Sequence, residues 1–205
     1  MDLRGALSYC PIVAILRGVK PDEVEGIGDA LIEAAVTVIE VPLNSPQPFE
    51  SIRRLAARHA HHALVGAGTV LETADVARVK AAGGQLIVAP NFDADVVRAA
   101  KAAGLAALPG VMTPSEGFAA LKAGADGLKL FPAEIIPPAV FRAWRAVFPA
   151  DCLLLAVGGV GVDNIRAYAE AGASGYGIGS ALYKPGRAPA EIGKLAGALV
   201  DAAKA

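Results

Sequence analysis

The stretch Gly127-Leu128-Lys129-Leu130-Phe131-Pro132 is a short apolar run with one charged side chain in its middle. As a β-strand it would place Lys129 and Phe131 on one face and the two leucines on the other, because side chains alternate along a strand. Pro132 would end this strand. The lysine face either meets water at a sheet edge or points into an enclosed site. In an enclosed site burial lowers the pKa of the amine, and a neutral amine is a nucleophile toward carbonyl carbons.

This run is one of eight similar runs, each followed by a turn and an alanine-rich segment with helical periodicity. The expected strands are 12–17, 38–43, 64–69, 86–90, 106–109, 127–131, 153–157 and 175–179. Eight regular units without a break in composition favour a closed (β/α)8 TIM barrel, α/β in class, with residues 1–205 as a single domain. An open doubly wound sheet is the alternative. Segment 189–203 has the spacing of a final helix, and the residues before Ser8 should form a helix across the bottom.

The composition limits the classes of partner. The 205 residues are 54% hydrophobic with a net charge of −1, which argues against disorder and against a broad nucleic-acid surface. No apolar stretch approaches the about 18 residues that a membrane span needs. Cys10 and Cys152 lie far apart in the sequence without CxxC spacing, which is typical of reduced thiols. We therefore expect a cytoplasmic protein whose partners are small molecules or copies of itself.

Charged residues are rare within the expected strands. They are Arg17, the last residue of its strand, and Glu40 and Lys129, each near the middle of its strand. The carboxyl ends of the strands carry the active site of a barrel, and alternation puts Glu40 on the same face as Val38 and Pro42. Glu40 and Lys129 should then meet over the barrel axis and act as catalytic groups. The alternative is a structural network of three buried charges.

Glycine pairs follow the last two strands. Gly158 and Gly159 close the seventh strand, and Gly177-Ile178-Gly179-Ser180 closes the eighth. Loops at these two positions commonly bind phosphate, because bare backbone N–H groups and a helix N-terminus attract an anion. Simple tight turning is the alternative.

Two further groups of residues carry weaker signals. His59, His61 and His62 have no acidic or Cys partner at ligand spacing, so we interpret them as solvated surface residues and expect no metal site. Trp144, Phe141 and Phe148 lie at helical spacing, which indicates core packing or a subunit contact.

Six motifs between about Pro11 and Tyr183 together carry a family resemblance. They are Ile15-Leu16-Arg17, Ile39-Glu40-Val41, Gly66-Ala67-Gly68-Thr69-Val70, Leu128-Lys129-Leu130-Phe131-Pro132, Val157-Gly158-Gly159-Val160 and Gly179-Ser180. With them the chain resembles the class I aldolases that cleave 2-keto-3-deoxy-6-phospho sugar acids.

The resemblance implies a homotrimeric barrel without metal or cofactor, in which Lys129 forms a Schiff base with the substrate ketone and Glu40 transfers protons. Arg17 and Thr69 match the residues that hold the pyruvyl end, and Pro90 lies against it. Gly159, Gly179 and Ser180 match the phosphate contacts. Gly158, Phe131 and Asn44 complete the expected substrate contacts, with Asn44 on the rim near the carbon 4 and carbon 5 hydroxyls.

One motif departs from part of the family. The phosphogluconate branch often has an arginine where Pro42-Leu43-Asn44-Ser45-Pro46 has Asn44, and the run looks like the phosphogalactonate branch instead. The implied substrate is 2-dehydro-3-deoxy-6-phosphogalactonate, cleaved to pyruvate and D-glyceraldehyde 3-phosphate. Alternatives within the family are 2-dehydro-3-deoxy-6-phosphogluconate and 4-hydroxy-2-oxoglutarate. Alternatives of another class are a phosphosugar isomerase or epimerase and a non-catalytic sugar-phosphate binding protein.

Overall fold

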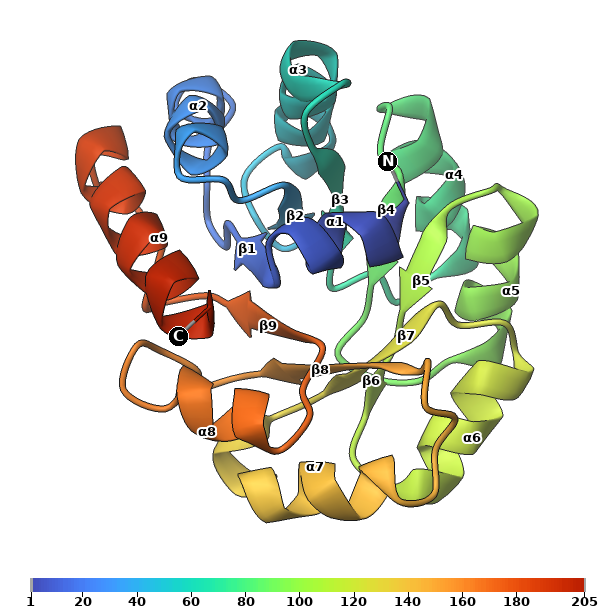
Figure 1. Cartoon of the computed structure of the whole chain (residues 1–205). Coiled ribbons are helices and arrows are strands. Elements are labelled where there is room, and N and C mark those ends of the chain that lie inside the picture. Colours follow the sequence, from blue (N-terminus) through green and yellow to red (C-terminus); the bar gives the residue numbers. More distant parts are fainter. Residues whose placement is uncertain (1, 205) are drawn as a thin grey trace.

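Parallel strands form a ring that helices surround, and α1 crosses one end of it (Figure 1). The computed structural model describes residues 2–204. The strands are β1 Ile12–Ile15, β2 Val38–Pro42, β3 Leu64–Gly68, β4 Leu86–Val88, β5 Ala106–Leu108, β6 Gly110–Val111, β7 Gly127–Leu130, β8 Leu153–Val157 and β9 Gly175–Ile178. The helices are α1 Leu3–Tyr9, α2 Val24–Glu33, α3 Pro48–His59, α4 Thr73–Ala81, α5 Ala94–Ala102, α6 Pro114–Lys122, the 3-10 turn η1 Ala133–Ile135, α7 Pro138–Arg145, α8 Ile165–Glu170 and α9 Pro189–Lys204. The eight predicted strands, the leading helix and the final helix are confirmed.

The barrel closes through a split fifth strand. β5 pairs with β4 and β6 pairs with β7, so the two ends of the sheet are consecutive pieces of one strand. Pro109 separates them because it has no N–H to donate, although its carbonyl accepts a 2.9 Å hydrogen bond from the N–H of Lys129. The predicted strand at 106–109 is therefore two short strands, and the closed barrel, rather than the open sheet, is the observed fold.

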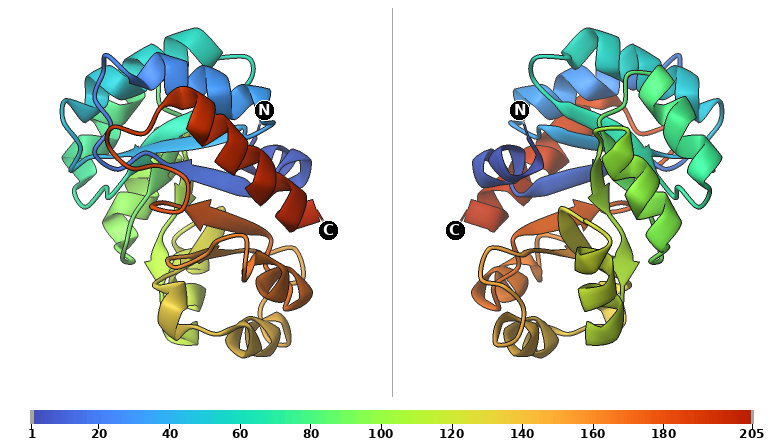
Figure 2. Two further views of the ribbon diagram at one scale, coloured as in Figure 1. Left: turned by 90° about the vertical axis from the view of Figure 1, so that its left-hand side faces the viewer. Right: turned by 90° about the vertical axis from the view of Figure 1, so that its right-hand side faces the viewer.

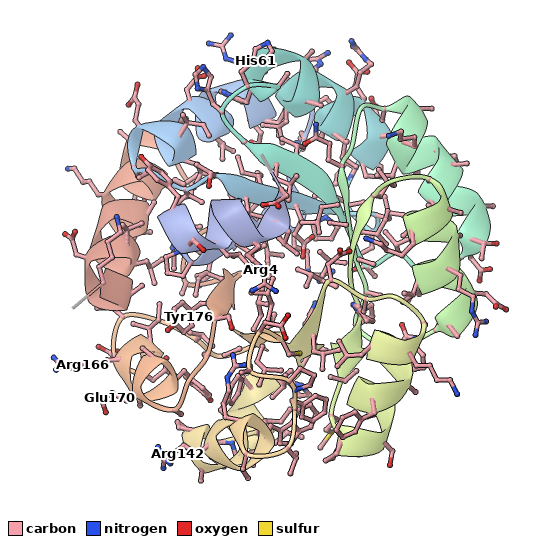
Figure 3. All side chains as sticks on the ribbon, turned by 45° about the vertical axis from the view of Figure 1, so that its right-hand side comes forward. Arg4, His61, Arg142, Arg166, Glu170 and Tyr176 are labelled. Carbon is pink, nitrogen blue, oxygen red and sulfur yellow. The ribbon has the colours of Figure 1, made fainter. Side chains whose placement is uncertain are left out.

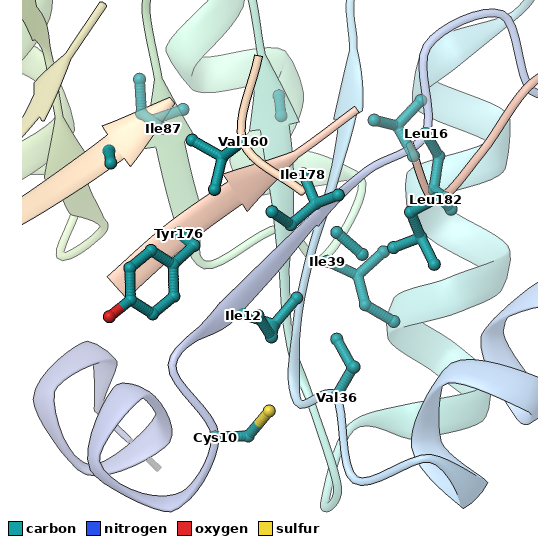
Figure 4. Packing of buried hydrophobic residues seen from close by; sticks show 14 of the residues in the cluster. Cys10, Ile12, Leu16, Val36, Ile39, Ile87, Val160, Tyr176, Ile178 and Leu182 are labelled. Carbon is teal, nitrogen blue, oxygen red and sulfur yellow. The ribbon is translucent and has the colours of Figure 1, made fainter. Parts of the chain in front are cut away.

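Two apolar layers lie inside and outside the ring. The inner layer is built from Val13, Ile15, Val38, Leu64, Leu86, Val88, Leu108, Leu153, Leu155 and Val157, and α1 closes its bottom with Leu3, Ala6 and Leu7. The outer layer lies between strands and helices, where Ile12, Ile39 and Ile178 of adjacent strands pack together (Figure 4). Leu128 and Leu130 belong to this outer layer, as alternation predicts, which turns Lys129 inward.

Local sequence signals set the helix ends. Thr113 and Glu116 form a reciprocal capping box at the start of α6, with Pro114 in the first turn. Gly83, Gly104, Gly124 and Gly172 have positive φ just after their helices, a conformation in which glycine caps a helix C-terminus. Side views show these helices packed around the barrel wall (Figure 2). Within residues 2–204 no helix combines the length and the apolar character that crossing a membrane requires.

Candidate active site

Lys129 points into the barrel from the middle of β7. Its side chain is buried, and Nζ lies 4.8 Å from the centre of the Phe131 ring. Burial lowers the pKa of the amine below its usual value, and the positive charge of Arg17 lowers it further, while Glu40 acts in the opposite direction. The amine therefore has the environment expected of a nucleophile.

Glu40 is the second buried charge on the inner face. It is 1% exposed, and its Oε2 atom has no hydrogen-bond partner within residues 2–204. Burial raises the pKa of the carboxyl to about 7, against the lowering effect of Lys129 and Arg17. None of the ion pairs formed by the described residues includes Glu40 or Lys129, so the alternative of a structural ion-pair network is not observed. A carboxyl with a pKa near 7 is suited to exchange protons at neutral pH.

Lys129 borders both a small void and a wide cavity. The void, about 10 Å³ in volume, is lined by Glu40, Lys129 and apolar side chains of the inner layer. This volume is close to the minimum for one water molecule. The cavity, about 780 Å³, opens at the carboxyl ends of β7, β8 and β9 and is also lined by Lys129. Glu40 and Lys129 thus meet near the axis, as predicted, and an occupant of the cavity can reach the amine from the open side.

Arg17 lies at the mouth of the cavity rather than inside a strand. It follows β1 in a turn and is exposed, so the prediction that it is buried within the strand was wrong. The chain leaves the barrel directly after Leu16, whose N–H still bonds to the carbonyl of Glu40. The guanidinium donates a 2.6 Å hydrogen bond to Oδ1 of Asn44, which fixes its direction. Asn44 is exposed on the rim, and only its NH₂ group is left to donate to another molecule.

The two glycine pairs line the far end of the same cavity. Gly158 and Gly159 both have positive φ, and Gly179 and Ser180 line the same cavity. The N–H groups of Gly159, Gly179 and Ser180 donate no hydrogen bond within residues 2–204. Asn164 holds the glycine turn by donating to the carbonyl of Gly159. Unpaired N–H groups at a turn form a site for an anion, and we call these four residues the glycine cradle.

Three cavity residues were missed by the sequence reasoning. Tyr183 is buried and donates from its hydroxyl to Glu23, while Lys184 lies beside it. Glu134 of η1 packs against the cradle, because a Cβ placed on Gly159 would lie only 2.9 Å from its carboxylate carbon. Nothing in the sequence around Glu134, which is exposed, distinguishes it from a solvated surface residue.

Thr69 and Pro90 follow β3 and β4 at the same end of the barrel, but neither lines the void or the cavity. Thr69 has φ of 56°, an uncommon conformation for a β-branched residue. Such outliers are concentrated at functional sites. Both residues stay predictions as substrate contacts.

The histidines and aromatic residues lie away from the site. His59 is buried and lies 3.5 Å from Asp29, so its prediction as a solvated residue was wrong, whereas His61 projects outward beside α3 (Figure 3). Burial lowers the pKa of His59. Trp144, Phe141 and Phe148 are buried, which confirms the first of the two predicted roles, core packing. Phe148 stacks on Trp144 at 4.7 Å and on Phe118 at 4.3 Å.

Comparisons with known proteins agree with this geometry. The model of the aldolase family described as KDPG and KHG aldolase matches residues 4–191. A probable 2-dehydro-3-deoxy-6-phosphogalactonate aldolase of Rhizobium meliloti is 49% identical, with 89% of this chain and 86% of the relative covered. A 2-dehydro-3-deoxy-6-phosphogalactonate aldolase of Escherichia coli is 42% identical over 94% of both chains. A solved structure described as "Native KDPGal structure" superimposes with a TM-score of 0.93 at 41% identity, covering 95% of this chain and 94% of that one. The chain belongs to the KDPG and KHG aldolase family and is an aldolase, a carbon-carbon lyase.

Proposed function

We propose that this aldolase cleaves 2-dehydro-3-deoxy-6-phosphogalactonate to pyruvate and D-glyceraldehyde 3-phosphate through a Schiff base on Lys129. The observation that carries the proposal is that Lys129 borders both the void and the cavity. Besides Lys129, the void is lined by Glu40 and apolar residues, and the cavity opens to solvent and includes the glycine cradle. A keto acid phosphate lying along the cavity would present its ketone to the amine and its phosphate to unpaired N–H groups.

The reaction requires an electron sink at carbon 2. The neutral amine of Lys129 attacks the keto carbon, and loss of water gives a protonated imine. The Glu40 carboxylate, directly or through one water, takes the proton of the carbon 4 hydroxyl as the bond between carbons 3 and 4 breaks. Glyceraldehyde 3-phosphate leaves, and the electrons of the broken bond form an enamine. Glu40 returns the proton to carbon 3, and hydrolysis of the imine restores Lys129 and releases pyruvate.

Arg17 and the glycine cradle hold the two ends of the substrate in this proposal. The planar guanidinium suits the carbon 1 carboxylate, and its bond to Asn44 orients it before substrate arrives. Thr69 and Pro90 are assigned to the pyruvyl end, and Phe131 to the wall beside Lys129. Gly158, Gly159, Gly179 and Ser180 receive the phosphate.

Reductive trapping tests the nucleophile. Pyruvate with borohydride should inactivate the enzyme and leave one reduced pyruvyl adduct per chain on Lys129, because borohydride reduces an imine to a stable amine. Peptide mass spectrometry locates the adduct. An adduct on another lysine, or none, would refute the mechanism.

Assays with both carbon 4 epimers test the substrate. The phosphogalactonate epimer should have the higher kcat/KM, with measurable activity on the phosphogluconate epimer. Two relatives named for the phosphogalactonate substrate and the uncharged Asn44 on the rim support this order. The preference should be modest, since one hydroxyl contact contributes on the order of 1–3 kcal/mol. A clear preference for phosphogluconate, or for 4-hydroxy-2-oxoglutarate, would overturn the assignment.

We also propose that copies of the chain assemble as a homotrimer in the cytoplasm. Phe118, Met112 and Val147 are about half exposed, and they lie on or beside α6 and α7 next to the stacked aromatic side chains. Exposed apolar side chains gathered on one part of a surface are typical of protein contacts. The free, buried Cys10 and Cys152 suit a reducing compartment. Light scattering should give three times the chain mass, and Phe118→Asp should reduce it.

A further inference from the structure

Gly68, at the end of β3, lies directly against the carboxylate of Glu40. The backbone of Glu40 is paired with Gly66, and the next residue on the same face of β3 is Gly68. A Cβ placed on Gly68 would overlap Oε2 and Cδ of Glu40 and would lie 2.6 Å from Oε1. Real Cβ atoms essentially never approach another atom closer than 3.0 Å. The carboxylate therefore occupies the volume that any side chain at position 68 would take.

Backbone conformation does not explain the glycine. Gly68 is absent from the residues of positive φ, and the left-handed residue of this turn is its neighbour Thr69. Gly66 differs in kind, because a Cβ there would meet the backbone carbonyl of Leu86 in the adjacent strand. At Gly66 the glycine serves strand packing, whereas at Gly68 it leaves space for a functional group.

We infer that Gly68 is a positioning residue for proton transfer: its missing side chain forms the niche that holds the Glu40 carboxyl in the enclosed void beside Lys129. This role rests on the proposed function of Glu40. The rest of the void is lined by Lys129 and by apolar side chains such as Val13, Val88 and Leu155. The apolar side chains offer no hydrogen bond, so a carboxyl expelled from the niche must turn toward Lys129 or toward the wide cavity. Near Lys129 or near solvent the Glu40 carboxylate anion is more stable than in the niche, so the pKa of the carboxyl should be lower there.

Two substitutions test the niche. Gly68→Ala fills it with a methyl group, and adding Glu40→Asp shortens the side chain whose carboxyl occupies it. The measured step is exchange of the pyruvate methyl protons for deuterium, followed by NMR. In this step Lys129 and pyruvate form the imine with loss of water, a base removes a methyl proton to give the enamine, and a deuteron returns to carbon 3. Borohydride trapping reports imine formation separately. Gly197→Ala, on α9 where a Cβ meets nothing within 4 Å, is the matched glycine control.

Gly68→Ala should slow deuterium exchange by about 10²-fold, the usual contribution of a general acid–base group. One adduct per chain should still form on Lys129 at saturating pyruvate, and the acid limb of the exchange rate should move to lower pH. In a Glu40→Ala background, Gly68→Ala should change exchange by less than about twofold, because residues that act as a unit are non-additive. Gly197→Ala should behave as the wild type.

The role of Gly68 would be overturned if Gly68→Ala exchanged deuterium at the wild-type rate. It would also be overturned if Gly68→Ala slowed exchange by the same factor in the Glu40→Ala background as in the wild type. Wild-type exchange in Glu40→Ala would instead overturn the assignment of Glu40 to proton transfer, and the positioning role with it. If Gly68→Ala does not fold, the Gly68→Ala/Glu40→Asp double variant decides the matter. It should fold with a Tm close to that of Glu40→Asp, because the shorter side chain vacates the niche, and a double variant that also fails to fold would overturn the inference.

Discussion

The two ends of the candidate site are built from different kinds of group. At the axis, Lys129 and Glu40 are single side chains enclosed by apolar residues, and burial shifts both pKa values toward neutrality. At the rim, the cradle of Gly158, Gly159, Gly179 and Ser180 is backbone open to solvent. Chemistry at pH 7 needs groups of adjustable charge, and removal of water adjusts them. Binding a phosphate needs only fixed dipoles, which a turn supplies without burying any charge.

Lys129→Met should show the largest difference between loss of cleavage and loss of phosphate binding. Methionine keeps the length of the side chain but has no amine. Cleavage should fall by about 10³-fold or more, since the variant lacks the amine that forms the imine. Binding of glyceraldehyde 3-phosphate, measured by calorimetry, should stay within about threefold, because the cradle is untouched. A large loss of affinity for the phosphate would show that the two ends do not act independently.

Removing the charge of Glu40 should affect the chemical end alone, though less severely. Glu40→Gln should keep borohydride trapping and slow cleavage by about 10²-fold. In the wild type kcat/KM should fall as the pH drops through about 7, because the carboxyl must be ionised to accept a proton. That limb should be missing from the pH profile of the variant. Nearly unchanged cleavage in a folded variant would make Glu40 structural.

At the rim, Gly159→Ala should raise KM for the phosphorylated substrate about tenfold and leave pyruvate trapping unchanged. The new Cβ would lie 2.9 Å from the Glu134 carboxylate carbon at a φ of 64°, and strain at such a residue is about 1–3 kcal/mol. Gly104→Ala is a control with the same backbone strain, since its φ is 72° and its Cβ meets nothing within 4 Å. Equal effects of the two variants would assign the change to strain and not to the cradle.

The smallest expected effect is at Glu134, whose negative charge lies beside the proposed phosphate site. Glu134→Gln should lower KM about threefold by removing like-charge repulsion, and the difference should shrink at high salt. Glu170→Gln, on the exposed face of α8 paired with Arg166, should change nothing. A higher KM in Glu134→Gln would mean that the carboxylate contacts a substrate hydroxyl.

The buried charged side chains could be predicted from the sequence more directly than the exposed rim of the site. Lys129 and Glu40 stand out because a charge inside an apolar run has few structural roles, and strand alternation alone brings them together. The exposure of Arg17 was missed because β1 ends at Ile15, two residues earlier than predicted, and the turn glycine Gly18 comes only after Arg17. Glu134 and the niche at Gly68 depend on contacts between different strands and loops, which a linear pattern does not contain. The cradle glycines were found only through their position after the seventh and eighth strands.

The ladder of hydrogen bonds around the barrel is interrupted at Pro109, where the fifth predicted strand is split. Pro109 accepts a hydrogen bond from the N–H of Lys129 but cannot return one to β7, and the N–H of Gly110 bonds to the loop carbonyl of Asn91 instead of to a strand. A ring of strands has no free edge, so fraying must begin where the ladder lacks a bond. The amide protons of Lys129 and Gly110 should accordingly exchange with solvent faster than those of β2 and β3 in the unliganded enzyme. Lys129 thus supplies both the proposed catalytic amine, on its side chain, and the backbone N–H that bonds β7 to the split strand.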